Sequence, residues 1–191
     1  MRIFSYTKSI ALACFIFCEA TSVAQQQPNV IVIYSDDQGA IDLNCYGSKD
    51  LETPNIDRLA KSGTMFTNFY ASPVCSPSRA SLLTGLNPQR AGLPGNASEL
   101  NDAVGMPSDR FTMAEMFKTA GYATAHIGKW HLGFPPVFGP LQSGYEEFFG
   151  PLSGGVDYFT HCDSRGTHDL WASEKNEVVE KTEIGYLTDL I

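Results

Sequence analysis

A cysteine and an arginine lie four residues apart at the predicted start of a helix, in the segment CSPSRASLLTG from Cys75 to Gly85. Backbone N–H groups at a helix N-terminus favour negative charge, so a thiolate, an alkoxide or a bound oxyanion at residue 75 would be stabilised. Side chains four residues apart share one helix face, so the Arg79 guanidinium could hold an anionic substrate group or a reactive oxygen. A small buried cysteine beside a surface arginine is the alternative.

Two adjacent carboxylates, Asp36 and Asp37, follow the apolar run NVIVIY. In a regular strand they would point to opposite faces, but at a strand end the backbone can turn so that both reach one ion. Oxygen ligands suit a hard cation such as calcium or magnesium. A solvated turn or a helix cap is the alternative for the same pair.

Lys129 and His131 lie two residues apart in GKWHLG, so in an extended segment both side chains face the same side. The lysine could bind an anionic group, and the histidine could hold or move a proton near neutral pH. The alternative is a loop lysine and a histidine packed by Trp130. Ser153 and His161, in GPLSGGVDYFTH, could contact a substrate, although isolated polar residues are more often structural or solvent-facing.

These residues need secondary structure that positions them. The sequence predicts a buried strand over 29–34, a helix over 53–63, a strand over 64–72, the helix from Cys75 to Gly85, a helix from a Thr112–Glu115 capping box to Gly121, a strand carrying His126, and a helix opening near the C-terminus. Alternation of strands and helices favours an α/β fold with a largely parallel sheet. In such sheets, ligands bind beyond the carboxyl ends of the strands.

The composition describes a globular chain of 191 residues with 43% hydrophobic and 18% charged residues. Its formal net charge of -8 argues against a general nucleic-acid binder. Residues 1–24 have the pattern of a secretory signal peptide cleaved after Ala24, with an N-terminal membrane anchor as the alternative. No other stretch is long and apolar enough to cross a membrane, so we expect no stable span after signal removal.

Three cysteines remain after the predicted signal peptide: Cys45, Cys75 and Cys162. An exported protein with an odd number of cysteines keeps at least one thiol outside any disulfide. Cys45 and Cys162 could pair, but their spacing alone does not show it. Cys75 is then the candidate for the remaining thiol.

Four segments resemble, in order, the type I sulfatases of the alkaline-phosphatase-like superfamily: PNVIVIYSDDQG, TPNIDRLAKSGTMFTNFYAS, CSPSRASLLTG and GYATAHIGKWHLG. The resemblance runs from Pro28 to about His161, and the C-x-P-S-R string is highly specific. GPLSGGVDYFTH looks most like the arylsulfatase B type, whose substrates are sulfated sugars. The resemblance implies a mixed, largely parallel sheet flanked by helices, with residues 25–191 as the N-terminal part of the catalytic domain.

In this family the cysteine of C-x-P-x-R is oxidised to Cα-formylglycine by a formylglycine-generating or sulfatase-maturating enzyme. The resemblance therefore implies that residue 75 acts as a hydrated aldehyde. One hydroxyl attacks the sulfur of a sulfate ester, and the second then loses its proton as sulfate leaves and the aldehyde re-forms. Asp36, Asp37 and the modified Cys75 would bind a divalent cation, calcium in most family members.

The resemblance also implies roles for the remaining polar residues. Arg79 would stabilise the deprotonated hydroxyl, Lys129 would bind sulfate, and His131 would orient or deprotonate the diol. Ser153 or His161 would reach the leaving-group side. A sulfated small molecule or glycan is the expected substrate, in a periplasmic or secreted protein, or a lysosomal or extracellular one in a eukaryote.

Family members also carry an Asp-Asn type pair of metal ligands, a further histidine and a further lysine in a second half that these residues do not include. Two aspartates and formylglycine leave a cation under-coordinated, so we expect the chain to be an incomplete part of the enzyme. One alternative function is a phosphatase or phosphonate hydrolase of the same superfamily, most of which use threonine or serine as nucleophile. Another is an inactive truncated product that at most binds sulfated glycans.

Overall fold

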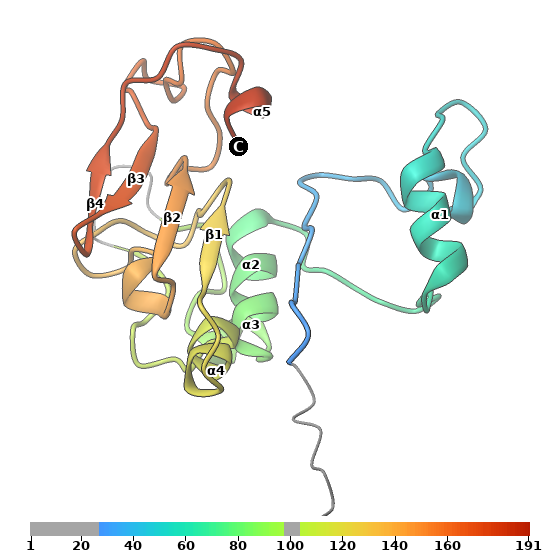
Figure 1. Cartoon of the computed structure of the whole chain (residues 1–191), viewed down its shortest axis with the longest axis horizontal. Coiled ribbons are helices and arrows are strands. Elements are labelled where there is room, and N and C mark those ends of the chain that lie inside the picture. Colours follow the sequence, from blue (N-terminus) through green and yellow to red (C-terminus); the bar gives the residue numbers. More distant parts are fainter. Residues whose placement is uncertain (1–26, 98–103) are drawn as a thin grey trace, which may run out of the picture. The chain divides into compact units, whose positions relative to one another are not determined.

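The computed structural model describes residues 27–97 and 104–191 (Figure 1). It divides into two compact units, one ending at Gly39 and one running from Ala40 to Ile191. The predicted signal peptide, 1–24, lies outside the described residues. No helix among the described residues has the length and apolar character needed to span a membrane.

The described part of the first unit, residues 27–39, is an extended segment that bends at Asp36 and Asp37. It contains no strand, so the predicted strand over 29–34 is wrong. The predicted burial of this segment is wrong as well, since the side chains of Ile31 and Ile33 are 83% and 84% exposed. A strand buried on both faces needs hydrogen-bonded neighbours and covering helices. The described residues of this unit provide neither.

The second unit contains short helices and a small sheet (Figure 1). In chain order its elements are η1 (Asn44–Tyr46), α1 (Pro54–Ser62), α2 (Cys75–Thr84), α3 (Pro88–Ala91), α4 (Met113–Thr119), β1 (Ala125–Ile127), η2 (Leu141–Ser143), β2 (Glu147–Gly150), β3 (Trp171–Glu174), β4 (Glu177–Glu180) and α5 (Leu187–Leu190).

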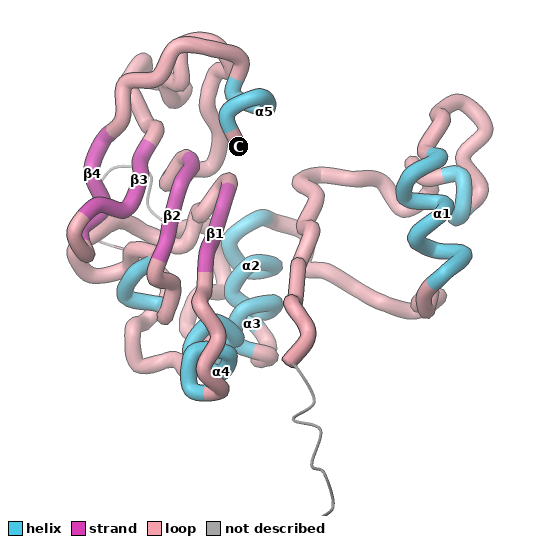
Figure 2. Tube along the Cα trace, viewed as in Figure 1, coloured by secondary structure: helices cyan, strands magenta, loops and turns pink. Residues whose placement is uncertain are grey.

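The four strands form one mixed sheet in the order β1-β2-β3-β4 (Figure 2). β1 and β2 pair in parallel, with His126 opposite Phe148. β2 with β3 and β3 with β4 pair antiparallel. The predicted α/β fold with a mixed sheet is confirmed, but the described sheet is less parallel than predicted, because β1 and β2 form its one parallel pair. This parallel pair lies beside the candidate site.

Local sequence signals place the predicted helices α1, α2 and α4 correctly. α1 begins at Pro54 after Thr53 and ends before Gly63, although the Thr53 hydroxyl accepts from the backbone N–H of Asn44 rather than capping the helix. α4 has the predicted capping box, in which the Thr112 side chain accepts from the Glu115 N–H and the Glu115 carboxylate accepts from the Thr112 N–H.

The strand predicted over 64–72 is wrong, because those described residues form loops and bends. Phe69 there is 77% exposed. Aromatic and β-branched residues favour a strand only where a neighbouring strand and a covering layer receive them.

The core of the second unit joins α2 to the segment that follows β1. Ala80 and Leu83 of α2 belong to the same buried cluster as Trp130 and Leu132, and Phe148 of β2 packs with them. The Trp130 indole N–H donates to the Phe138 carbonyl at 2.9 Å, so this large side chain is buried without losing its hydrogen bond. This cluster fixes the position of α2 relative to residues 129–132.

Candidate active site

Helix α2 begins at Cys75, as the sequence predicts. Val74 precedes it in an extended conformation, and the Ser78 N–H donates to the Val74 carbonyl at 3.2 Å. The helix ends at Thr84, where Gly85 has a φ of 67° that a glycine adopts without strain. Cys75 is half-buried and the five residues after it are buried, so the helix N-terminus is embedded in the protein with residue 75 at its edge.

Lys129 reaches the predicted nucleophile. Its Nζ donates to the Cys75 Sγ at 3.3 Å, across 54 residues of sequence. An ammonium group at this distance favours an anion at residue 75 and adds to the effect of the helix N-terminus. Lys129 and the N-terminus of α2 together make the surroundings of the Cys75 side chain electropositive.

Arg79 is buried on the same helix and holds the backbone of Lys129. Its Nη1 donates to the Lys129 carbonyl, and His126 Nε2 lies 3.0 Å from the same oxygen. A carbonyl only accepts, so this contact requires the His126 tautomer with hydrogen on Nε2. Burial is the main cause of a lowered pKa for His126, against the opposite effect of this hydrogen bond. His126 thus holds the Lys129 backbone, and its lowered pKa favours the neutral imidazole.

His131 is buried, and its backbone is held at both ends. Its N–H donates to the Leu152 carbonyl at 3.0 Å, and its carbonyl accepts from the Ser76 hydroxyl at 2.6 Å. Its φ of 52° is uncommon for a residue with a side chain and marks a locally strained backbone. The structure thus ties the His131 backbone to the residue that follows Cys75.

The Leu152 contact belongs to a ladder that extends the parallel pairing of β1 with β2. The Gly128 N–H donates to Phe149 and the Trp130 N–H donates to Pro151, at 2.8 and 2.9 Å. Residues 128–131 therefore run beside 149–152, past the end of β1 and, from Pro151 on, past the end of β2. This register places Lys129 and His131 at the carboxyl end of β1, where ligands bind in α/β folds.

Ser153 and His161 are buried and bonded within their own region of the chain. The Ser153 hydroxyl donates to the Gly155 carbonyl at 3.4 Å, and His161 Nε2 lies 3.1 Å from the Gly185 carbonyl. His161 has a φ of 55°, so its backbone is also in the left-handed region. None of these contacts tests a role in substrate binding, which stays a prediction for both residues.

Asp36 and Asp37 belong to the first unit and are exposed. Asp37 has a φ of 51°, which breaks the alternation of an extended chain between the two side chains. Two adjacent carboxylates on such a bend supply hard oxygen ligands, so this pair suits calcium or magnesium. Their role as metal ligands stays a prediction.

The sequence model of the Sulfatase family matches residues 28–184, most of the chain. The chain belongs to the sulfatase family. The match includes the CSPSR segment, GKWHLG and both aspartates.

Curated sulfatases are similar over the same part of the chain. Human N-acetylgalactosamine-6-sulfatase is 44% identical over 131 residues, which cover 64% of this chain and 25% of that protein. Human steryl-sulfatase is 45% identical over 128 residues, covering 64% and 22%. N-acetylgalactosamine-6-O-sulfatase of Bacteroides thetaiotaomicron is 48% identical over 124 residues, covering 62% and 23%. The chain spans about a quarter of the length of these relatives.

Solved structures support the alkaline-phosphatase-like fold of the sulfatases. The crystal structure of Ps i-CgsB has a TM-score of 0.74 and 36% identity, covering 86% of this chain and 39% of that one. Its complex with k-i-k-neocarrahexaose has a TM-score of 0.68 and 35% identity, covering 81% and 37%. The expected fold class is confirmed, for a chain that covers part of these structures.

The sulfatase chain contains a buried carboxylate that sequence analysis missed. Asp169 is 4% exposed. It accepts hydrogen bonds from the backbone N–H groups of Leu152 and Ser153, at 3.2 and 2.8 Å, and from the indole N–H of Trp171 at 2.7 Å. Asp169 lies in no recognisable motif, and its donors are mostly backbone groups, so the sequence carries no signal for it.

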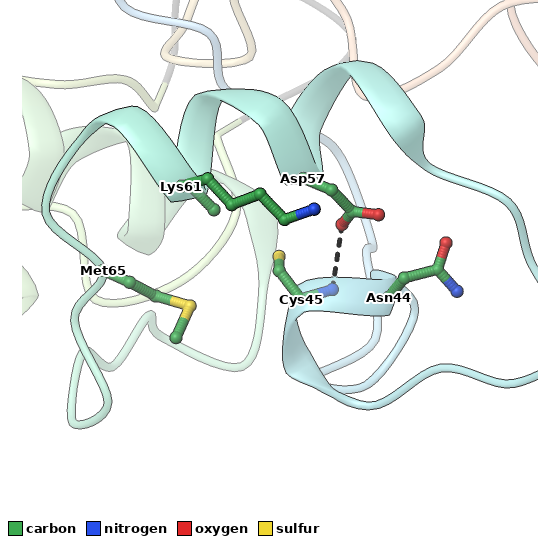
Figure 3. Close-up of a pocket in the computed structure, with 6 residues that line it drawn as sticks. Asn44, Cys45, Asp57, Lys61 and Met65 are labelled. Atoms are coloured by element: carbon green, nitrogen blue, oxygen red, sulfur yellow. Dashed lines mark hydrogen bonds between the residues drawn. The ribbon is translucent and has the colours of Figure 1, made fainter.

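The possible disulfide between Cys45 and Cys162 is not formed, and both cysteines are free. Cys45 lies in an open pocket of about 420 Å³ between η1 and α1, lined by Asn44, Cys45, Asp57, Ala60, Lys61 and Met65 (Figure 3). The Cys45 N–H donates to Asp57 Oδ1 at 2.9 Å. Partial burial, then the Asp57 carboxylate, raises the pKa of the Cys45 thiol. A raised pKa lowers the fraction of thiolate at neutral pH, so it weakens Cys45 as a nucleophile.

Proposed function

We propose that this protein hydrolyses sulfate esters with a formylglycine made from Cys75. The contact between Lys129 Nζ and Cys75 Sγ, at 3.3 Å, is the observation that carries the proposal. It puts a fixed positive charge beside the residue that the C-x-P-x-R motif marks for oxidation. Family membership supplies the reaction class, because the match includes this motif.

The reaction follows from the chemistry of the hydrated aldehyde at residue 75. One hydroxyl attacks the sulfur of the ester, and the bond from sulfur to the leaving alcohol breaks. The second hydroxyl then gives up its proton, the carbon–oxygen bond to the transferred sulfate breaks, and the aldehyde re-forms. A serine at this position would form a sulfate ester with no such exit, which is the physical reason for the unusual nucleophile.

The surrounding residues perform binding and proton transfer. Lys129 binds a sulfate oxygen, and Arg79 stabilises the ionised hydroxyl through the charge it brings to the same helix. His131 orients the diol or takes its proton. A calcium ion held by Asp36 and Asp37 would neutralise charge on the sulfate group when bound. Ser153 or His161 would contact the leaving-group side.

Sulfated sugars are the proposed substrate class. The curated relatives include sulfatases named for N-acetylgalactosamine 6-sulfate, and one similar structure was solved with a neocarrahexaose. Steryl-sulfatase is similar over a region of the same size, so we place substrate specificity largely in the loops. The segment 1–24 would direct the protein to the periplasm or the outside of the cell. The protein with formylglycine at residue 75 would act there.

The first test is the mass of the peptide that contains Cys75, from protein made in a host with a formylglycine-generating system. We expect an aldehyde in place of the thiol. The Cys45 peptide from the same digest is the matched control, because it carries no C-x-P-x-R motif and should keep its thiol. Finding only thiol at residue 75 would remove the nucleophile from the proposal.

The second test compares a sulfate ester with the matching phosphate ester, using the product of the whole reading frame. We expect turnover of the sulfate ester and a Cys75→Ser variant limited to a single turnover, with sulfate left covalently on residue 75. A preference for the phosphate ester would favour the phosphatase or phosphonate hydrolase alternative. Steady turnover by Cys75→Ser would contradict the aldehyde mechanism.

A further inference from the structure

Ser76 lies between the predicted nucleophile and the predicted proton-transfer residue, and the C-x-P-x-R motif leaves its identity open. Its side chain is completely buried. A serine hydroxyl has one proton to donate. Ser76 donates it to the His131 carbonyl at 2.6 Å and accepts from the Ala97 N–H at 3.0 Å. The hydroxyl therefore bonds two segments that are far from it in sequence.

The backbone of Ser76 takes part in the same network. Its N–H, one of those left without a helical partner at the start of α2, donates to Asn96 Oδ1 at 3.2 Å. Residues 96 and 97 thus contact Ser76 through both its backbone and its side chain. This fixes the residue firmly, so that its hydroxyl can hold other groups in place.

His131 needs such support. Its φ of 52° is costly for a residue with a Cβ atom and persists only where the surroundings hold it. The Leu152 carbonyl holds its N–H, and the Ser76 hydroxyl holds its carbonyl. We infer that Ser76 is a positioning residue that fixes the His131 backbone relative to the nucleophile at residue 75. This inference deepens the proposed function and rests on it for its catalytic consequence.

Ser76→Ala would leave the His131 carbonyl and the Ala97 N–H without this partner in a buried site. Both residues are at most 5% exposed, so water cannot easily replace the hydroxyl. We expect hydrogen exchange at the Ala97 N–H and across 129–132 to accelerate roughly tenfold. A shift of His131 by a fraction of an ångström would lower kcat by roughly ten- to a hundredfold, with KM within about twofold of its normal value.

Two control variants make the test specific. Ser76→Thr keeps the hydroxyl and should restore slow exchange and most of kcat. Ser81→Ala removes a hydroxyl from the same helix whose Oγ is buried without a hydrogen-bond partner among the described residues. It should leave exchange at residues 97 and 129–132 unchanged.

The experiment uses the product of the whole reading frame, measuring aldehyde content at residue 75, kcat and KM for a sulfate ester, and hydrogen exchange for each variant. Faster exchange in Ser76→Ala with normal aldehyde content and a lower kcat supports the inference. Exchange equal to that of Ser81→Ala, or an unchanged kcat, overturns it. If the unsubstituted protein turns over no sulfate ester, the proposed function fails, and the exchange data alone decide whether Ser76 holds the His131 segment.

Discussion

Replacing Asp169 should destabilise the protein and loosen the candidate site. Asp169→Ala leaves three buried donors without their acceptor: the N–H groups of Leu152 and Ser153 and the indole N–H of Trp171. At about 1 kcal/mol for each donor, the low end of the range because water can enter the space left by the carboxylate, the loss is about 3 kcal/mol. That is a large fraction of the stability of an ordinary domain, roughly 5–15 kcal/mol.

Asp169→Asn should cost less, about 1 kcal/mol, because its amide oxygen still accepts from Leu152 and Trp171 while its NH₂ group faces one donor. The matched control is Asp109→Ala, since the Asp109 side chain is 74% exposed and pairs with the neighbouring Arg110 at 3.5 Å. Its effect should stay within about 0.5 kcal/mol.

Urea denaturation of the three variants measures these differences. The Asp169→Ala midpoint should fall by roughly 1–2 M with little change in slope. Hydrogen exchange at His131 should also accelerate, because the Leu152 peptide that Asp169 holds carries the carbonyl bonded to the His131 N–H. An Asp169→Ala loss no greater than that of Asp109→Ala would refute the reasoning, because it would mean that water satisfies all three donors.

Three further predictions concern other parts of the site and its supports. Lys129→Met keeps the length of the side chain but removes its charge beside Cys75, and should lower kcat/KM for a sulfate ester roughly a hundredfold at equal aldehyde content; a change under twofold would exclude a role in binding sulfate. Burial lowers the pKa of His126 below 6.5, so as the pH drops the unfolded state binds a proton at this residue before the folded state does. The free energy of unfolding should therefore fall below about pH 6.5, and His126→Gln should weaken this pH dependence in urea titrations. Thr112→Ala removes the cap of α4 and a 2.7 Å bond to the Ser143 carbonyl, and should cost about 1–2 kcal/mol by urea denaturation, whereas a smaller loss would show the cap to be redundant.

Local signals predicted those elements that depend on nearby residues. The Thr112–Glu115 capping box, the glycine after α2 and the proline that opens α1 all act within a few residues, and each helix begins or ends close to its predicted position. The runs 29–34 and 64–72 failed because a strand depends on distant partners. Composition alone does not show whether a neighbouring strand will be present.

In the candidate site, too, features that depend on nearby residues were predicted and features that depend on distant partners were not. The residue types and spacing in CSPSR and GKWHLG predicted chemistry at both segments, and the family resemblance related them to one reaction. The contact between Cys75 and Lys129 confirms that they meet. Ser76 and Asp169 were not predicted, because their main partners are backbone groups 55 and 16–17 residues away. Hydrogen bonds to a distant backbone leave no pattern of side chains to read.

If Cys75 is oxidised as proposed, the burial of Pro77 and Arg79 sets a time limit on that oxidation. An enzyme that reads C-x-P-x-R must reach both residues, and in the folded protein they are covered. That enzyme would therefore have to act before α2 packs against residues 129–132. This packing requires residues 129–132 to have been synthesised. At roughly 5–20 residues per second, the 54 residues between Cys75 and Lys129 take about 3–10 s to make. On this proposal, maturation and folding would compete for the same few seconds, and a chain that folded first would keep a thiol at residue 75.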